Sequence, residues 1–341
     1  MKRITSTVML IASAAAVAAC GSSSSTSSSA ASSGGAASST ASGPPPKVCV
    51  MAEFKSRADG IPGLQATYGD VWGSYPVTIV DKTAEKEIAS GQCDAGEVFT
   101  TDSGIAANSL TVLQDDKTLF PPDNIGLIVR SQVLKAHPGI AAIVDPIAAT
   151  ITTDVITKLN KMVEIDGQKP ADVAKAYLQQ IGASATASAT GGGGTSSCPA
   201  PGSSLDGGGA SVSIGSKSFA EEEILAEIAR QALTAHNFSV TYTTQEADPQ
   251  IGQDLSAGKI DMYWQYTGTE LQKYDNVDSP MRDLHAAFQQ AKGLDDAKGL
   301  CWVGEAPMDD TNGLAIRSTD TGKFGSTLSA FTAYLQAHPG S

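Results

Sequence analysis

Basic and aromatic side chains are scarce in this sequence. Its 341 residues include 23 Lys and Arg against 36 Asp and Glu, which gives a formal net charge of −13, and only 6% are aromatic. A protein that binds nucleic acid through its phosphates needs a concentrated positive surface. The acidic balance therefore excludes nucleic acid as an expected partner.

Long apolar runs and fibrous repeats are absent as well. No stretch reaches the length of about 18 apolar residues that a membrane-spanning helix needs, and neither a Gly-X-Y period nor a sustained heptad occurs. We therefore expect neither a polytopic membrane protein nor a fibrous one. Apart from a leader and two low-complexity tracts, the chain is long enough for one large or two small lobes.

Motifs for catalysis and for metal binding are also missing. No GxSxG, Walker A, HExxH or GxGxxG pattern with the necessary flanks is present. The cysteines form no CxxC pair and the four histidines are scattered, so the spacing of zinc ligands is absent. The sequence predicts no catalytic residue, no metal site and no cofactor.

The N-terminus has the pattern of an export signal. Two basic residues precede an apolar segment from Val8 to Ala19 that is too short to span a bilayer. This segment ends in VAAC and resembles the bacterial lipobox, in which the cysteine receives a diacylglyceryl group. We expect residues 1–19 to be a lipoprotein signal peptide and Cys20 to be lipidated. The alternative is an ordinary cleaved signal with an incidental cysteine.

Two tracts have the composition of disordered segments. Small and polar residues dominate residues 20–46 and 183–210, which leaves little apolar surface to bury. We expect the first tract to be a tether and the second to be a flexible linker. The position of the second tract inside the chain needs an explanation.

Four further cysteines allow three pairings, and export permits disulfides. Cys49 and Cys93 each open a predicted strand of one sheet. This favours a Cys49–Cys93 bond and leaves Cys198 for Cys301, although the thiols could also remain free.

Strands and helices alternate in both halves of the remaining chain. KVCVM and CDAGEVFTTD in the first half, and SVSIGSKS and KIDMYWQYTG in the second, have the pattern of strands, whereas FAEEEILAEIARQAL has that of a long helix. Ser218 and Glu221 form a capping-box pattern at its start. Two pairs of segments echo each other, ASGQCDAGEVFTTD with SAGKIDMYWQYTG and NIGLIVRS with NGLAIRS. This predicts two similar α/β lobes joined by two crossing strands.

Three segments carry a family resemblance. GSKSFAEEEIL, GKIDMYWQYTGTEL and LQDDKTLFPPDNIGLIVRSQVLKAHPGI resemble the substrate-binding proteins of ABC importers for glycine betaine, choline and related osmoprotectants. The resemblance covers residues 47–182 and 211–341. It implies a two-lobed α/β periplasmic-binding-protein fold (type II, Venus flytrap) with two interlobe crossing strands and the ligand in the cleft.

The order of the segments differs from that of the family. The segment that closes the family's domain comes first here, and the tract 183–210 joins it to the segment that opens the domain. We interpret this order as a circular permutation, with a partial duplication as the alternative. Lobe 2 is then expected at about 47–122 and 313–341, and lobe 1 at about 123–182 and 211–312.

The resemblance and the aromatic residues at strand ends predict a ligand site. Rings at strand ends can hold a quaternary ammonium by cation–π contact. The family's cage tyrosine falls on Tyr266, whereas Asp123 and Asn312 stand where the family usually has tyrosines, and Glu222 replaces a glutamine. The predicted ligand-binding residues are Tyr266, Thr269, Phe219, Glu222, Trp264, Thr101, Asp102, Asp123 and Asn312.

These observations predict an extracytoplasmic, lipid-anchored and monomeric substrate-binding protein. It would capture glycine betaine, choline or a related solute and deliver it to a membrane permease that is driven by a separate ATPase. The missing cage walls and the added carboxylates favour a cation such as choline over zwitterionic glycine betaine, while a polyol is also compatible. The alternative functions are a solute-sensing or scaffold lipoprotein with a degenerate cleft and, less well supported, an envelope hydrolase.

Overall fold

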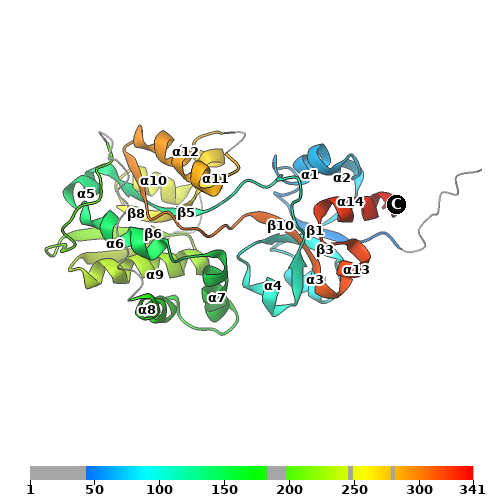
Figure 1. The fold of residues 1–341 in the computed structure, drawn as a ribbon, viewed down its shortest axis with the longest axis horizontal. Helices are drawn as coiled ribbons and strands as arrows, with labels where there is room; N and C mark the ends of the chain where they lie inside the picture. Colours follow the sequence, from blue (N-terminus) through cyan, green and yellow to red (C-terminus); the bar gives the residue numbers. More distant parts are fainter. Residues whose placement is uncertain (1–43, 183–196, 245–248, 278–280, 341) are drawn as a thin grey trace, which may run out of the picture. The chain divides into compact units, whose positions relative to one another are not determined.

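The computed structural model describes residues 44–182, 197–244, 249–277 and 281–340. The chain divides into two compact units, Met1–Ser39 and Thr40–Ser341, and all of the described residues belong to the second unit. The predicted signal peptide, Cys20 and the first part of the predicted linker lie outside the described residues. Figure 1 shows the order of the elements along the chain.

The first of two mixed sheets has the strand order β2-β1-β3-β10-β4. Strand β1 runs parallel to β2 and β3, whereas β10 runs antiparallel to β3 and β4. We call this sheet and its helices lobe 2. Its strands are β1 (Val48–Met51), β2 (Val77–Val80), β3 (Ala95–Phe99), β4 (Leu110–Val112) and β10 (Asn312–Arg317).

Helices cover both faces of this sheet (Figure 1). Leu64, Trp72 and Phe331 of α1, α2 and α14 form one core against β1, and Ile88 of α3 packs on the other face. The helices are α1 (Ile61–Tyr68), α2 (Val71–Ser74), α3 (Glu85–Ala89), α4 (Ser103–Ala107), α13 (Thr321–Phe324) and α14 (Leu328–Ala337).

The second sheet has the strand order β7-β6-β8-β5-β9. Strand β6 is parallel to β7 and β8, and β5 is antiparallel to β8 and β9. We call this sheet and its helices lobe 1. Its strands are β5 (Ile125–Arg130), β6 (Ser211–Ser216), β7 (Ser239–Thr244), β8 (Met262–Tyr266) and β9 (Leu300–Val303).

Two hydrophobic cores lie on opposite faces of the lobe 1 sheet. Ile224 and Ile228 of α9 belong to the larger core, and Ile251 and Phe288 belong to the smaller one. The α-helices are α5 (Ser131–Ala136), α6 (Gly139–Ala148), α7 (Thr153–Glu164), α8 (Pro170–Ile181), α9 (Ala220–Ala235), α10 (Gln250–Ser256), α11 (Thr267–Thr269) and α12 (Leu284–Asp296). A π-helical turn, η1 (Glu270–Tyr274), continues α11.

The two sheets have equivalent strand orders, so the predicted two-lobed α/β fold is confirmed. In each sheet a parallel three-strand unit is followed by one antiparallel strand and an edge strand. The antiparallel strand comes from the chain segment that has just left the other sheet, β10 in lobe 2 and β5 in lobe 1. The echoed segments of the sequence are β3 with β8 and β5 with β10, and each pair occupies the same place in its sheet.

The segments that enter these crossing strands are hydrogen-bonded to each other. Residues 113–124 lead into β5, and residues 304–311 lead into β10. Asp310 N donates to the Asp123 carbonyl over 3.2 Å, and Thr311 Oγ1 donates to the Pro121 carbonyl over 2.6 Å. The two connections between the lobes therefore run side by side.

Both predicted disulfides, Cys49–Cys93 and Cys198–Cys301, are present. The second one corrects the expectation that all of residues 183–210 form a flexible linker. Cys198 is buried, Gly202 N donates to the Pro138 carbonyl, and Gly207 N donates to the His236 carbonyl. Residues 197–210 are thus fixed against lobe 1, because a disulfide and backbone hydrogen bonds compensate for their low apolar content.

The predicted capping box at Ser218 is wrong. Helix α9 begins at Ala220 with Phe219 as its N-cap, and no side chain caps it. Glu221 does not return to the N-cap backbone but is buried in hydrogen bonds with Tyr266 and Asn160. Hydrogen bonds to residues distant in the sequence have replaced the local capping interaction of Glu221.

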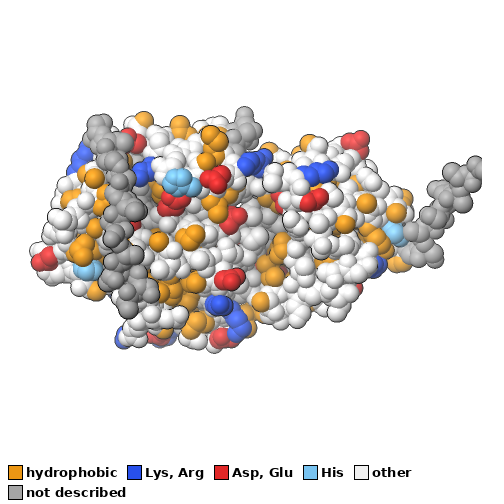
Figure 2. Space-filling model, in the orientation of Figure 1, with side chains coloured by type: hydrophobic (Ala, Val, Ile, Leu, Met, Phe, Trp, Pro, Cys, Tyr) orange, Lys and Arg blue, Asp and Glu red, His pale blue; other side chains and the backbone are white. Residues whose placement is uncertain are grey.

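No single helix among the described residues is long and apolar enough to cross a membrane; α6 and α7 reach the required length only as a pair bent by 90°. Much of α6 lies in the larger core of lobe 1. On the face shown in Figure 2, basic side chains are scattered among acidic ones and form no continuous patch.

Candidate ligand-binding site

Tyr266, at the end of β8, lies against one aromatic ring and one lysine. Its side chain is 4% exposed, and its hydroxyl donates to Glu221 Oε1 over 2.6 Å. The Phe219 ring stacks on it with centroids 6.3 Å apart and planes inclined by 28°. Lys217 Nζ lies 4.7 Å from the centroid of the Tyr266 ring. The structure thus brings together the predicted pair Tyr266 and Phe219 and adds Lys217, which the sequence analysis did not select.

Polar groups from both lobes meet beside Tyr266. Asn160 Nδ2 of α7 donates to Glu221 Oε2 over 2.6 Å and to the carbonyl of Thr101, which follows β3, over 3.2 Å. Thr101 Oγ1 donates to Asp310 Oδ1 over 2.6 Å. We call Tyr266, Glu221, Asn160, Thr101 and Asp310 the polar cluster. Lobe 1, lobe 2 and one crossing segment all contribute to it.

Burial and mutual repulsion govern the ionisation of the polar cluster. Burial raises the pKa of Glu221, and burial together with the charge of Glu221 raises the pKa of Asp310 well above its ordinary value. Burial also raises the pKa of Tyr266, and the charges of Glu221, Glu222 and Asp310 add to this effect. The nearby cation is already engaged, since Lys217 Nζ lies 3.6 Å from Glu222 Oε1 and donates to Gln265 Oε1 over 2.8 Å. The cluster therefore has more acidic groups than cations to neutralise them.

Asp123 and Thr269, both predicted ligand-binding residues, are neighbours in the structure, and Asp123 binds the backbone. Its Oδ1 accepts from the N–H of Gly268 over 2.6 Å and from that of Thr269 over 3.3 Å. A carboxylate at the first turn of a helix is a favourable acceptor for N–H groups that have no partner within the helix. Burial nevertheless raises the pKa of Asp123 to about 7. This carboxyl fixes α11 beneath Tyr266.

Three predicted residues have partners outside the polar cluster. Trp264 is 0% exposed in the larger core of lobe 1, and its indole N–H donates to the Leu225 carbonyl over 2.8 Å. Asp102 accepts from its own turn, from Phe99 N over 2.8 Å, and burial and Glu85 raise its pKa to about 8. Trp264 is therefore a packing residue in this structure, and Asp102 stabilises a turn.

Asn312 belongs to a separate network in lobe 2. With its amide oriented to suit its neighbours, it accepts from both terminal nitrogens of Arg57 over 3.2 Å and donates to Glu97 Oε1 over 3.3 Å. Burial raises the pKa of Glu97 to about 7. Asn312 thus faces a buried carboxyl and a guanidinium.

Sequence reasoning missed Asn160, Lys217 and the position of Glu221 beside Tyr266. Nothing in the helix pattern around Asn160 distinguishes it from a surface asparagine. The run of three glutamates at the start of α9 was a usable signal, because a helix that packs on a sheet must bury at least one of three consecutive positions. Asp310 was not among the predicted ligand-binding residues.

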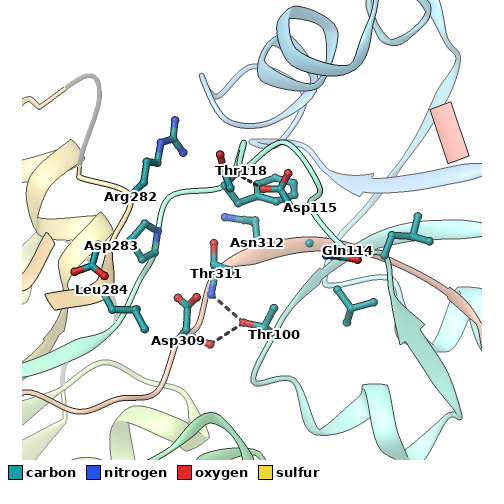
Figure 3. Close-up of a pocket in the computed structure, with 15 residues that line it drawn as sticks. Thr100, Gln114, Asp115, Thr118, Arg282, Asp283, Leu284, Asp309, Thr311 and Asn312 are labelled. Atoms are coloured by element: carbon teal, nitrogen blue, oxygen red, sulfur yellow. Dashed lines mark hydrogen bonds between the residues drawn. The ribbon is translucent and has the colours of Figure 1, made fainter. Parts of the chain in front are cut away.

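An open cleft of about 510 Å³ lies on the crossing segments but does not include Tyr266 (Figure 3). On one side of this cleft, Thr100 Oγ1 donates to the Asp309 carbonyl and accepts from the backbone N–H of Thr311. Arg282 Nη1 donates to the Leu119 carbonyl. Phe120 is its one aromatic side chain, so the cleft contains no aromatic pair. Its size alone does not make it the better candidate, since the aromatic pair and the buried polar groups lie at Tyr266.

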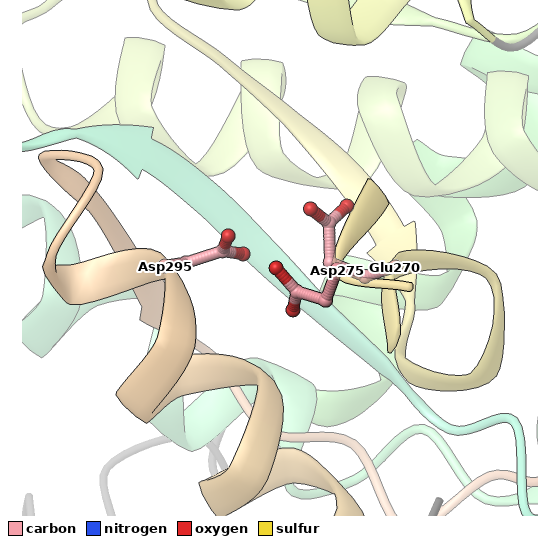
Figure 4. A group of neighbouring side chains, drawn as sticks. All are labelled: Glu270, Asp275 and Asp295. Carbon is pink, nitrogen blue, oxygen red and sulfur yellow. The ribbon is translucent and has the colours of Figure 1, made fainter. Parts of the chain in front are cut away.

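A group of three carboxylates in lobe 1 has the geometry of a cation site. Glu270, Asp275 and Asp295 converge with their oxygens within 4.8 Å of one another (Figure 4). Lys298 Nζ lies 2.9 Å from Asp295 Oδ1, 3.9 Å from Glu270 Oε1 and in contact with Asp275. Its ammonium supplies the positive charge that these carboxylates need, so we interpret the group as an internal ion-pair network.

Comparison with known proteins gives a family. The family model described as "Substrate binding domain of ABC-type glycine betaine transport system" matches residues 36–180 and 210–329, more than half of the chain. A glycine-betaine-binding protein of Pseudomonas aeruginosa is 34% identical over 103 residues, which are 30% of this chain and 33% of that protein. An ergothioneine transport permease/ergothioneine binding protein of Helicobacter pylori is 31% identical over 130 residues, 38% of this chain and 23% of that protein.

The matched segments thus span a third or less of the length of these two relatives. Among solved structures, an ancestral arginine-binding protein bound to arginine has 10% identity and a TM-score of 0.35, covering 85% of this chain and 92% of that chain. This score is too low to add to the assignment, which rests on the family model. By that match, the chain belongs to the family of substrate-binding domains of ABC-type glycine betaine transport systems.

Proposed function

We propose that this protein is the extracytoplasmic substrate-binding lipoprotein of an ABC importer. It captures a small osmoprotectant, of which glycine betaine and choline are the first candidates, and delivers it to a permease with a separate ATPase. The observation that carries the proposal is Tyr266 at the end of β8, with Phe219 stacked on it and polar groups of both lobes beside it. The family match and the names of the two relatives, a glycine-betaine-binding protein and an ergothioneine-binding protein, support it. It carries out no reaction on the solute.

Closure of the lobes is the step that couples binding to transport. Ser103 Oγ of α4 donates to Glu164 Oε2 at the end of α7 over 2.6 Å, and Asn160 bonds to Thr101 across the same interface. A solute shifts the open and closed populations only by its difference in affinity for the two states. A ligand that contacts Tyr266 of lobe 1 and Thr101 of lobe 2 at once has such a difference, and the closed form is the one that the permease binds.

The anchor and the monomeric state belong to this proposal. Cys20 lies outside the described residues, so its support is the VAAC sequence alone. Metabolic labelling with a radioactive fatty acid should label the native chain and leave Cys20→Ser unlabelled. Label retained by the variant would refute the anchor. Size-exclusion chromatography with light scattering should give the mass of one mature chain.

We also propose that the chain is a circular permutation of the family's domain. Pro46 and Gly340 lie near each other in lobe 2, since Tyr75 donates to the Pro46 carbonyl over 2.7 Å and a side chain on Gly340 would collide with Pro76. The elements on either side of the predicted linker, α8 and α9, pack against each other in lobe 1. At both places, near Pro46 and Gly340 and between α8 and α9, the chain can be either joined or cut without moving the elements. This is compatible with the present order of segments and with the order that we infer for the family's domain.

A ligand screen by thermal shift tests the proposed function. Glycine betaine, choline, carnitine and polyols at millimolar concentration are added to the mature chain, and a bound ligand raises the melting temperature. Tyr266→Ala should weaken binding of the best ligand by about tenfold, because it removes one ring face and a donor to Glu221.

Tyr177→Phe is the matched control for this experiment. It removes a buried tyrosine hydroxyl in the same lobe, one that bonds to Thr150 away from the polar cluster. It should leave the affinity unchanged. Absence of a shift with every solute would instead favour the scaffold lipoprotein of our alternative.

A further inference from the structure

The polar cluster contains a buried acceptor that lacks a donor. Asn160 is 4% exposed, and no described residue donates a hydrogen bond to its Oδ1. The orientation of the amide is fixed by its neighbours, since Nδ2 contacts the Thr101 carbonyl and Glu221 Oε2, which are both acceptors. Exchanging the two amide atoms would place oxygen against oxygen twice. A buried polar atom without a partner costs free energy and is a place where a ligand can contribute.

The groups around Asn160 Oδ1 are also mainly acceptors. Glu221 accepts from the Tyr266 hydroxyl and from Asn160 Nδ2, and Thr101 also contributes to its hydrogen bonding, whereas Asp310 accepts from the Thr101 hydroxyl. Each carboxylate has about four lone-pair positions, so both retain capacity for further donors. The nearest ammonium, that of Lys217, is shared with Glu222 and Gln265. The cluster can accept further N–H donors, and a cationic ligand that supplies them would favour the charged forms of Glu221 and Asp310, whose pKa values burial raises.

The aromatic part of the site is small by comparison. Tyr266 has Phe219 stacked on it and the Lys217 ammonium 4.7 Å from its ring centroid. Asp123 and Asn312 add no ring face, and their side chains bond to backbone N–H groups and to Arg57 respectively. A fully methylated ammonium has no hydrogen to donate and depends on ring faces. Here it would leave the acceptors of the cluster unsatisfied.

We propose that the solute is a cation that carries N–H groups, a primary ammonium or guanidinium compound, and that Asn160 Oδ1 and the carboxylates of Glu221 and Asp310 accept from these groups. This rests on the proposed function, because it concerns the ligand of the same site. According to this proposal, the polar cluster is what makes the protein bind unmethylated amines more tightly than methylated ones.

Two matched pairs of ligands test the inference by calorimetric titration of the mature, oxidised chain. Ethanolamine differs from choline, and glycine from glycine betaine, only in having N–H groups in place of methyl groups. We expect ethanolamine to bind at least about tenfold more tightly than choline, because a charged hydrogen bond to a buried acceptor contributes at least this factor. Glycine should bind more tightly than glycine betaine for the same reason, and both should bind more weakly than ethanolamine, since the carboxylate that they share is repelled by the cluster.

Two variants test whether the polar cluster is the part of the protein that distinguishes unmethylated from methylated amines. Glu221→Gln removes the charge but keeps the shape, and should lower the ratio of ethanolamine to choline affinity about tenfold. Glu227→Gln is the control, because Glu227 is a buried glutamate on the same helix whose partners are Arg230 and Gln231. It should leave the ratio unchanged. Should Glu221→Gln fail to fold, the ratio measured on the native chain still decides the inference.

The outcomes separate the two proposals. Tighter binding of choline and glycine betaine than of their unmethylated partners would overturn this inference and leave the proposed function intact. Equal affinities within each pair would also overturn it. Absence of binding by all four compounds, with no shift in the broader solute screen, would overturn the proposed function and this inference with it.

Discussion

Lobe 1 and lobe 2 have the same strand order but different chemistry at the ends of their strands. In lobe 2, β3 runs into small hydroxyl side chains, Thr100 and Thr101, whereas β8 of lobe 1 ends in the ring of Tyr266. Lobe 1 also supplies Glu221 and Asn160 from helices that face the same point. Ligands of open α/β sheets bind at such strand ends. The comparison teaches that a repeated framework positions the site, while lobe 1 contributes most of its groups.

The disulfides give the largest test of this comparison, because each lobe has one. Cys198–Cys301 in lobe 1 spans a sequence separation of 103 residues and Cys49–Cys93 in lobe 2 one of 44. Loop-closure entropy predicts a loss of about 4.7 kcal/mol for the Ser/Ser variant of the first bond and about 4 kcal/mol for that of the second. Urea unfolding measures both losses. If removal of Cys49–Cys93 lowered the free energy of unfolding more than removal of Cys198–Cys301 did, loop length would not determine which disulfide stabilises the protein more.

Two buried tryptophans provide a second pair. Trp264 donates to the Leu225 carbonyl in lobe 1, and Trp72 donates to Thr332 Oγ1 over 2.9 Å in lobe 2. Each Trp→Ala variant should lose about 3 to 5 kcal/mol of unfolding free energy through a cavity and a lost hydrogen bond. Phe219→Ala is the control, since Phe219 is 43% exposed and should cost less than about 1 kcal/mol. If Trp264→Ala cost as little as Phe219→Ala, its assignment to the core would be untenable.

Buried carboxyl groups give each lobe a dependence on pH. Burial raises the pKa of Glu97 in lobe 2 to about 7 and that of Glu270 in lobe 1 to about 8, each from 4.5, and Asp295 adds to the rise at Glu270. Because the folded chain holds these protons after the unfolded chain has released them, the stabilisation is complete below about pH 4.5 and is lost as pH rises through 7 and 8. We expect the free energy of unfolding to fall between pH 5 and pH 8.

Glu97→Gln and Glu270→Gln separate the contributions of the two lobes. Each should reduce the fall by on the order of 1 to 3 kcal/mol, and Glu270→Gln should act up to a higher pH. Urea titrations at constant ionic strength measure the slope. A slope that neither substitution changes would mean that other groups carry the pH dependence.

The smallest effect is expected from reordering the chain. A gene that encodes residues 197–341, then the sequence from residue 44, and ends at residue 182 restores the order that we infer for the family's domain. Pro46 and Gly340 already lie near Tyr75 and Pro76, so joining the chain there should strain little of the fold. The melting temperature should therefore change by only a few degrees and the ligand affinity by less than about twofold. An unfolded product would count against the permutation and favour a partial duplication.

Several features could be predicted because they depend on local pattern. The apolar alternation of β1, β3, β6 and β8, the echoed pairs of strands and both disulfides agree with the structure. Strand patterns persist because a strand buried on both faces tolerates few polar residues. Tyr266 and Phe219 could be selected because large rings at the end of a strand and the start of a helix are informative positions.

Other features depend on contacts between distant residues. Ser218 and Glu221 satisfy a capping pattern, but Tyr266 and Asn160 offer Glu221 better partners. Trp264 and Tyr266 are two residues apart on one strand, so both should point to the same face. Local sequence could not separate their roles, but in the structure the tryptophan reaches the α9 backbone and the tyrosine reaches Glu221.

The sequence by itself therefore indicated most of the elements and the two lobes and favoured the observed pairing of the cysteines, since periodicity, turn residues and strand position are encoded locally. Only the tertiary structure decided which groups form the site. It brings Thr101, Asn160 and Asp310 together from three separate segments, fixes residues 197–210 against lobe 1, and places the Lys217 ammonium over Tyr266. Hydrogen bonds and ion pairs depend on which residues are close in three dimensions, and the separation of two residues in the sequence does not predict this.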